Sequence, residues 1–274
     1  MRYDFGIRTC TTGRPFRAND LRAIHDYGFT AVELSFNRAV SQLNWSDTAL
    51  GKVIHATASR LSIQLSGHIP DELGLAVPDP DMCEQNIQHF MQIIESASFF
   101  GIQNLVFHPD GSIKNEPSCH GAQLENLVRA LEKLLPVCKK TGIRLLMETL
   151  PPSRFSSRLE NLTQALDHIQ SKYMALCIDT NHLNLTENLA PAIRKLVGRI
   201  GEFHFNDNHG SVEEHLLPFD GIIRWDEVAE AVAVVNFDGS IILEPSHYDP
   251  SRYASLLDAT AAILPRLRAT FATH

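Results

Sequence analysis

Short apolar runs that each end on a carboxylate or an imidazole recur along this 274-residue sequence. They are LSIQLSGH, IQNLVFH, IRLLME, MALCIDTNH, IGEFHFND and SIILE. Continuous apolar runs of this length are typical of strands buried on both faces in a parallel sheet. Because parallel strands bring their carboxyl ends to one face, the sequence predicts that the polar residues at these ends converge: His68, His108, Glu148, Asp179, His182, His204 and Glu244.

Strand-like and helix-like segments alternate over the whole chain. Apolar residues follow a helical spacing at 86–99 and at 124–137. Eight repeats of a strand and a helix predict the α/β class and a single (β/α)8 TIM barrel domain over residues 1–274. An open doubly wound sheet is the weaker alternative, because no G-x-G-x-x-G follows the first strand. The expected strands begin near Tyr3, Thr30, Leu61, Gln103, Ile143, Met174, Ile200 and Ser240.

The distribution of charge argues against a nucleic-acid partner. The net charge is −8, and neither 61–113 nor 200–223 contains a lysine or an arginine. A polyanion would find little counter-charge at the loops in these stretches, whereas bound divalent cations would offset their acidity. No segment approaches the roughly 18 apolar residues of a membrane span, and no apolar leader is visible, so a cytoplasmic protein without a membrane partner is expected. Five cysteines without a C-x-x-C pair favour free thiols.

Three carboxylates and one imidazole are the best candidates for metal ligands: Glu148, Asp179, Glu244 and His204. An open, oxygen-rich set of this kind suits Mn²⁺, Mg²⁺, Co²⁺ or Fe²⁺, and it also accepts Zn²⁺. We expect one divalent ion, which a substrate would bind through two adjacent oxygens. The ion would stabilise an enediolate, while Glu148 and Glu244 transfer the proton. Two acid–base groups on opposite faces of a substrate are what an epimerase or an isomerase needs.

A second group of candidates consists of His68, His108, His182 and His215. We interpret these histidines as groups that bind substrate hydroxyls or orient the metal-binding carboxylates. Ligation of additional zinc ions is the alternative, because imidazole-rich sites favour zinc, and Glu213 would then join His215. Other chemistries are disfavoured. No lysine ends a predicted strand for Schiff-base formation, and the chain has neither a G-x-S-x-G elbow nor a P-loop.

The segment Glu202–Trp225, EFHFNDNHGSVEEHLLPFDGIIRW, resembles the sugar phosphate isomerase/epimerase branch of the xylose isomerase-like TIM barrel superfamily. It is similar to the family pattern of His-x-x-Asp-Asn, a loop with His-Leu, and then Gly-x-Ile-x-Trp. Phe219-Asp220-Gly221 departs from the glycine-rich form that is usual in relatives. The resemblance extends over nearly the whole chain. It implies metal ligation by the four residues named above, with the two glutamates among them as acid–base groups, and it implies that His182 and His215 line the same site.

The same superfamily contains endonuclease IV-type DNA repair enzymes, which bind three zinc ions. Their nine ligand positions also have counterparts in this chain: His68, His108, Glu148, Asp179, His182, His204, Glu213, His215 and Glu244. DNA is disfavoured by the loop after His68, IPDELGLAVPDPD, which is acidic and offers no aromatic wedge for a kinked duplex.

These observations favour a divalent-metal-dependent isomerase or epimerase of a sugar, a sugar phosphate or a related polyol ketone. A multi-zinc phosphoesterase is the alternative, and a barrel that binds a sugar or a metal without turnover is a third interpretation. The expected partner is a small carbohydrate. A phosphorylated substrate is not favoured, because the loop after Glu244 contains a single cation, Arg252. Barrels of this type often pair, so a homodimer is one expected assembly.

Overall fold

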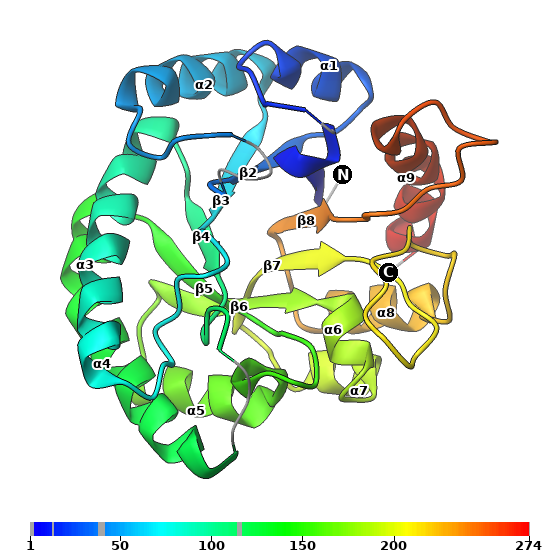
Figure 1. The fold of residues 1–274 in the computed structure, drawn as a ribbon. Coiled ribbons are helices and arrows are strands. Elements are labelled where there is room, and N and C mark those ends of the chain that lie inside the picture. The colour runs from blue at the N-terminus through cyan, green and yellow to red at the C-terminus, as the bar shows by residue number, and fades with distance from the viewer. Residues whose placement is uncertain (1–2, 13, 38–41, 114–116, 274) are drawn as a thin grey trace.

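A computed structural model describes residues 3–12, 14–37, 42–113 and 117–273. Eight parallel strands follow one another around a barrel, and β8 closes it by pairing with β1 (Figure 1). The predicted α/β barrel is confirmed, and the open doubly wound alternative is wrong. The strands are β1 Asp4–Arg8, β2 Ala31–Ser35, β3 Gln64–His68, β4 Asn104–Phe107, β5 Arg144–Glu148, β6 Met174–Asp179, β7 Ile200–Phe205 and β8 Ser240–Leu243.

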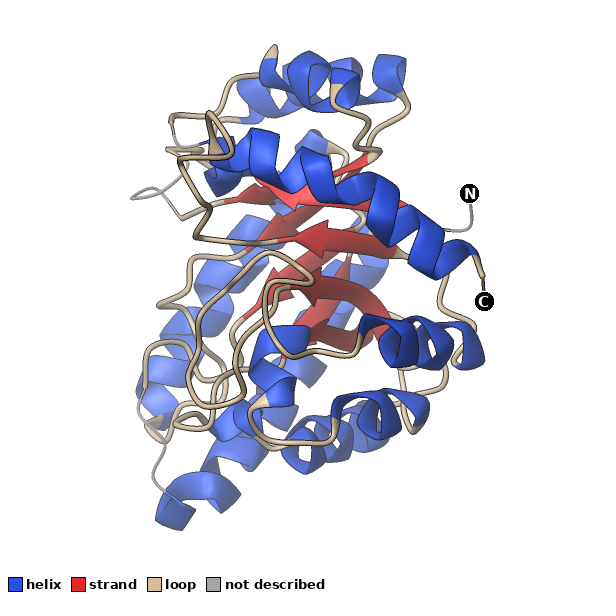
Figure 2. Ribbon diagram, turned by 90° about the vertical axis from the view of Figure 1, so that its right-hand side faces the viewer, coloured by secondary structure: helices blue, strands red, loops and turns tan. Residues whose placement is uncertain are grey.

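Helices surround the barrel, and the long loops gather on the side toward which the strand arrows point (Figure 2). Over the described ranges, none of the helices has both the length and the apolarity to span a membrane. The α-helices are α1 Asp20–Asp26, α2 Thr48–Leu61, α3 Pro80–Ala97, α4 His120–Thr141, α5 Leu159–Ile169, α6 Thr180–Asn184, α7 Leu189–Arg194, α8 Trp225–Val234 and α9 Leu256–Ala272. Short 3-10 helices are η1 Thr9–Thr12, η2 Ser98–Phe100, η3 Pro117–Cys119 and η4 Phe155–Ser157.

The third strand begins later than the sequence predicts. Leu61 ends α2 instead of starting the strand, which begins at Gln64. Ser62 ends the helix because its backbone is left-handed, with φ of 55°, and its N–H reaches back to the last helical turn. The apolar residues Leu61 and Ile63 flank this turn, so they made the apolar run longer than the strand itself.

Alternation along the strands separates two kinds of core. In β5, Leu145 and Met147 belong to the large apolar core beneath the helices, whereas Leu146 belongs to a small interior cluster. Successive side chains of a strand point to opposite faces, so Glu148 continues the inward series begun by Leu146. The other members of the interior cluster lie on the neighbouring strands β4 and β6: Val106, Ala175 and Cys177. Steps of two residues lead from them, too, to the carboxyl ends of their strands. On β4, β5 and β6 the barrel interior therefore changes from apolar to polar at its carboxyl end.

Strands β1 and β2 approach closely at Gly6, whose register partner is Ala31. A Cβ atom at residue 6 would lie 2.5 Å from the backbone oxygen of Ala31, so Gly6→Ala must push the two strands apart. We expect the free energy of unfolding, measured by urea denaturation, to fall by about 1–3 kcal/mol, the usual cost of overpacking. Gly121→Ala is the control, because a Cβ there meets nothing within 4 Å. Equal stability of the two variants would contradict this close contact.

Candidate metal centre at the barrel mouth

The polar residues predicted to converge meet at the carboxyl-terminal mouth of the barrel. His182 lies in α6, which begins directly after β6, and His215 lies in the loop that follows β7. The other six each lie within one residue of the end of a different strand: His68 on β3, His108 after β4, Glu148 on β5, Asp179 on β6, His204 on β7 and Glu244 after β8.

Four of these residues form a compact set of possible ligands. One ligand atom from each lies within 4.8 Å of the other three, and all four residues are buried: Glu148, Asp179, His204 and Glu244. Nδ1 of His204 lies 3.2 Å from Oε1 of Glu148 and 3.2 Å from Oε2 of Glu244. Three buried carboxylates this close together repel one another unless a positive charge lies between them. The donor set therefore fits a divalent cation with a preference for oxygen.

The pKa shifts show how strongly these charges interact. Burial alone would raise the pKa of Glu148, but the imidazoles of His204 and His108 hold it well below its usual value. Burial would lower the pKa of His204, yet the carboxylates of Glu33 and Glu148 contribute to raising it well above its usual value. The surrounding carboxylates thus favour a positive charge at His204, whether from a proton or from a metal ion. Metal ions bind by displacing such protons.

Two further groups flank the central set. In one, Nε2 of His68 and Nε2 of His108 lie 2.9 Å and 3.2 Å from the same oxygen of Glu148, Oε2. This group therefore shares Glu148 with the central set.

The other group lies on the loop side. Nε2 of His182 and Nε2 of His215 lie 3.2 Å and 2.9 Å from Oε1 of Glu213. The ligand atoms of each flanking group also lie within 4.8 Å of one another. The nine residues singled out in the sequence thus fall into three groups, each with the spacing of a metal site.

Charged residues that the sequence analysis did not single out complete the mouth. Glu33, in the middle of β2, is fully buried, and its Oε2 lies 3.0 Å from Nε2 of His204. Arg8, the last residue of β1, forms ion pairs with Glu33, with Asp71 and with Glu244. Glu202 lies on β7 two residues before His204 and is also fully buried. The sequence does mark both buried glutamates: each is a charged residue inside an otherwise apolar strand, at a position where the alternation of side chains points toward the barrel interior.

The loop after β7 is anchored by the carboxylate of Asp207. It accepts hydrogen bonds from the backbone N–H groups of Phe219 and Ile223, at 3.0 Å each, and from Nε1 of Trp225 at 2.9 Å. The backbones of Asp207 and Leu216 also pair with each other. These bonds fix the loop between β7 and α8, which carries two of the flanking ligands, Glu213 and His215. The sequence departure at 219–221 lies within this anchored stretch.

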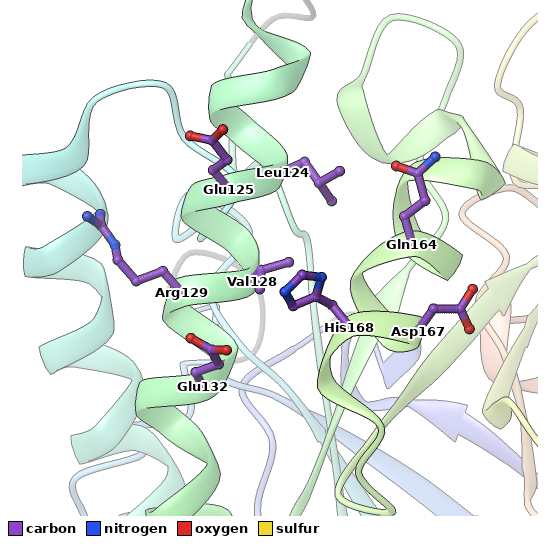
Figure 3. Close-up of a pocket in the computed structure, with 8 residues that line it drawn as sticks. All are labelled: Leu124, Glu125, Val128, Arg129, Glu132, Gln164, Asp167 and His168. Carbon is purple, nitrogen blue, oxygen red and sulfur yellow. The ribbon is translucent and has the colours of Figure 1, made fainter.

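A separate pocket of about 570 Å³ lies on the outer surface of the barrel, between α4 and α5 (Figure 3). It contains none of the metal-type ligands at the mouth. Its lining comes from the two helices alone: Leu124, Glu125, Val128, Arg129, Glu132, Gln164, Asp167 and His168. Volume alone therefore does not identify the chemical site, which is defined by the converging charges.

Comparison with known proteins places the chain in a defined family. The family described as xylose isomerase-like TIM barrel matches residues 21–266. A crystal structure of D-psicose 3-epimerase, determined in the presence of D-fructose, has a TM-score of 0.82 and 17% sequence identity, and the match covers 98% of this chain and 99% of that one. This structural likeness shows that the fold is shared.

Sequence relatives include both classes of enzyme considered above. D-psicose 3-epimerase of Ruminiclostridium cellulolyticum is 30% identical over 232 residues, which are 80% of this chain and 74% of the relative. A probable endonuclease 4 of Aster yellows witches'-broom phytoplasma is 27% identical over 164 residues, 55% of each chain. Some matches are partial: in two other curated relatives the matched region is 57% of the relative's length.

Removal of the Asp207 carboxylate tests the anchoring of the loop. Asp207→Ala leaves three backbone N–H groups, those of Asn208, Phe219 and Ile223, and the Trp225 indole without their buried acceptor, so we expect a loss of at least about 2 kcal/mol in unfolding free energy. Hydrogen exchange in residues 208–224 should also become faster. Asp220→Ala is the matched control, because Asp220 is exposed in the same loop. Unchanged exchange in Asp207→Ala would contradict the anchoring role.

Proposed function

Because the chain belongs to the xylose isomerase-like TIM barrel family, we propose that it is a divalent-metal-dependent epimerase or isomerase of an unphosphorylated ketose or related polyol ketone. The observation that carries this proposal is the buried, compact set of Glu148, Asp179, His204 and Glu244 at the barrel mouth. The relatives named D-psicose 3-epimerase support the same class of reaction.

Proton transfer is assigned to Glu148 and Glu244. When bound, a divalent cation would polarise the carbonyl of a sugar and make the neighbouring C–H more acidic. The two carboxylates approach Nδ1 of His204 from β5 and from the end of β8, so they flank a small ligand at the mouth from different sides. One carboxylate takes the proton from the carbon, and the other returns a proton to the opposite face, which inverts that carbon.

Binding of the sugar hydroxyls is assigned to the histidines around this pair. Burial would lower the pKa of His182, but Asp179 and Glu213 raise it to about 9. Its Nδ1 lies 2.8 Å from the carbonyl oxygen of Thr149 and its Nε2 faces Glu213, so both ring nitrogens donate near neutral pH. We assign the positioning of hydroxyl groups to His182 and His215, because both rings lie beside Glu213 on the loop side of the mouth. His68 and His108 orient Glu148 and can contact the substrate from the other side.

An unphosphorylated substrate is proposed because two arginines near the mouth in the described part of the chain, Arg8 and Arg252, are already engaged. Arg8 forms ion pairs with three carboxylates, those of Glu33, Asp71 and Glu244. Arg252 packs over the ring of Tyr253 and donates to its hydroxyl oxygen. A phosphate group would have to compete with the carboxylates for Arg8, in a mouth that is rich in negative charge.

Replacing each proposed acid–base group separates proton transfer from binding. With D-psicose, D-fructose and D-tagatose as test substrates, wild-type protein should exchange solvent deuterium into the carbon beside the ketone. Glu148→Gln and Glu244→Gln should each slow this exchange by about 10²- to 10⁴-fold, the usual contribution of a general acid–base group. The exchange is followed by proton NMR.

Metal content is measured on the same samples, so that a loss of metal is not mistaken for a loss of proton transfer. Glu125→Gln is the control, because Glu125 is an exposed glutamate on α4 in the outer pocket of Figure 3. The proposal is wrong if both variants at the mouth carry metal and still exchange at the wild-type rate.

A multi-zinc phosphoesterase is the second candidate function. It is favoured by one specific observation: the two flanking groups have the spacing of metal sites, and one of them shares Glu148 with the central set. The relative named probable endonuclease 4 supports it as well. The lack of lysine and arginine in 61–113 and 200–223 weighs against a DNA substrate.

Counting the metal ions distinguishes the two functions. We expect about one Mn, Co, Mg or Fe ion per chain, by plasma mass spectrometry of protein purified without chelators or a histidine tag. We also expect no cleavage of an oligonucleotide with an abasic site. Three zinc ions per chain, together with cleavage that His108→Ala abolishes, would establish the phosphoesterase and overturn the epimerase.

A further inference from the structure

The two ring nitrogens of His204 face different partners. Nδ1 lies toward the proposed metal ligands, 3.2 Å from an oxygen of Glu148 and 3.2 Å from an oxygen of Glu244. Nε2 lies 3.0 Å from Oε2 of Glu33, on the interior side of the ring. Both Glu33 and His204 are fully buried, so water does not compete for this contact.

Glu33 is the better acceptor of the two interior carboxylates near this nitrogen. Oε1 of Glu202 is 3.8 Å from Nε2 of His204, which is beyond hydrogen-bond distance. The same oxygen of Glu202 already accepts a hydrogen bond from the Ser66 hydroxyl, at 3.0 Å. Strand pairing explains the position of Glu33, because β2 aligns it with Arg8 of β1 on one side and with Ser66 of β3 on the other.

Arg8 connects this interior carboxylate with the metal-binding face. Its Nε lies 3.3 Å from Oε1 of Glu33, and its Nη1 donates to Oε1 of Glu244. The second oxygen of Glu244, Oε2, is the one that faces His204. One guanidinium group thus contacts both Glu33 and Glu244, and it compensates charge that would otherwise be costly to bury.

We propose that Glu33 is a positioning residue of the metal centre: it accepts the Nε2–H of His204, so that the lone pair of Nδ1 is directed to the metal ion, and Arg8 fixes Glu33 and Glu244 relative to each other. This inference rests on the metal dependence in the proposed function. A histidine ligand commonly donates its other N–H to a carboxylate, which fixes both the tautomer and the ring orientation. In this chain the carboxylate comes from a strand that supplies none of the proposed ligands.

The test compares metal binding by two isosteric variants, one at each of the two interior carboxylates near Nε2 of His204. Metal-free wild type, Glu33→Gln and Glu202→Gln are titrated with Co²⁺, and the visible absorption of the bound ion is recorded. We expect Glu33→Gln to raise the dissociation constant by about 10- to 100-fold, because an amide can also donate to Nε2 and thereby favour the wrong tautomer. Its Co²⁺ spectrum should change as well. Glu202→Gln should leave both the constant and the spectrum close to those of wild type.

A second measurement reads the metal-bound nitrogen directly in the wild-type protein. In the wild-type zinc-loaded protein, nitrogen-15 NMR of the histidine rings, assigned through the loss of signals in His204→Gln, reports which nitrogen of His204 is bound. We expect Nδ1 to carry the metal and Nε2 to keep a slowly exchanging proton.

The outcomes separate this inference from the proposed function. Metal bound through Nε2, or equal Co²⁺ binding by wild type and a folded Glu33→Gln, would overturn the role of Glu33 while the metal-dependent function stands. Absence of any metal binding by wild type would overturn both. Thermal unfolding of the metal-free forms shows whether Glu33→Gln keeps the fold, so that weaker binding is not caused by general destabilisation.

Discussion

Several carboxylates are buried around a single imidazole ring at the mouth of this barrel, and they need positive charge in order to stay there. Glu33 contacts one nitrogen of His204, while Glu148 and Glu244 contact the other. The mutual repulsion is visible in the pKa values. Burial raises the pKa of Glu202 to about 7, with the charge of Glu33 adding to the shift. For Glu33, burial acts in the same direction, but His204 and other cations lower its pKa to about 2. Arg8 supplies one fixed cation, and a divalent ion would supply the rest.

Closure of the barrel is what creates this concentration of charge. Eight parallel strands place all their carboxyl ends at one mouth, and the alternation of inward side chains decides which residue of each strand enters it. One inward step deeper, the side chains on β4, β5 and β6 are apolar, at Val106, Leu146, Ala175 and Cys177, whereas Ser66 on β3 and Glu202 on β7 are buried and polar. The ligands are carried by strands whose outward residues belong to the large core. Rigid elements of this kind hold a site more accurately than loops do.

The sequence predicted the barrel and the residues at the strand ends because both follow from local rules. Apolar runs marked the strands, and the last polar residue of a run marked the mouth. The same rule missed Glu33 and Glu202, because they lie inside strands and not at strand ends. The pairing of β2 with β1 and β3 and of β7 with β6 and β8 shows which residues they lie beside. Arg8 does end a strand, but its guanidinium is not a metal ligand, so a rule based on metal-ligating side chains does not select it. The late start of β3 after Leu61 depends on the left-handed backbone of Ser62. Serine has no marked preference for this conformation, so the sequence does not predict the turn.

The most direct test of the proposed metal centre is to locate the ion. Crystals of the wild-type protein grown with Mn²⁺ would be measured by anomalous diffraction at the manganese edge. We expect an anomalous peak enclosed by Glu148, Asp179, Nδ1 of His204 and Glu244, with Nε2 of His204 still hydrogen-bonded to Glu33. The absence of a peak within that set, while these side chains are ordered, would contradict it.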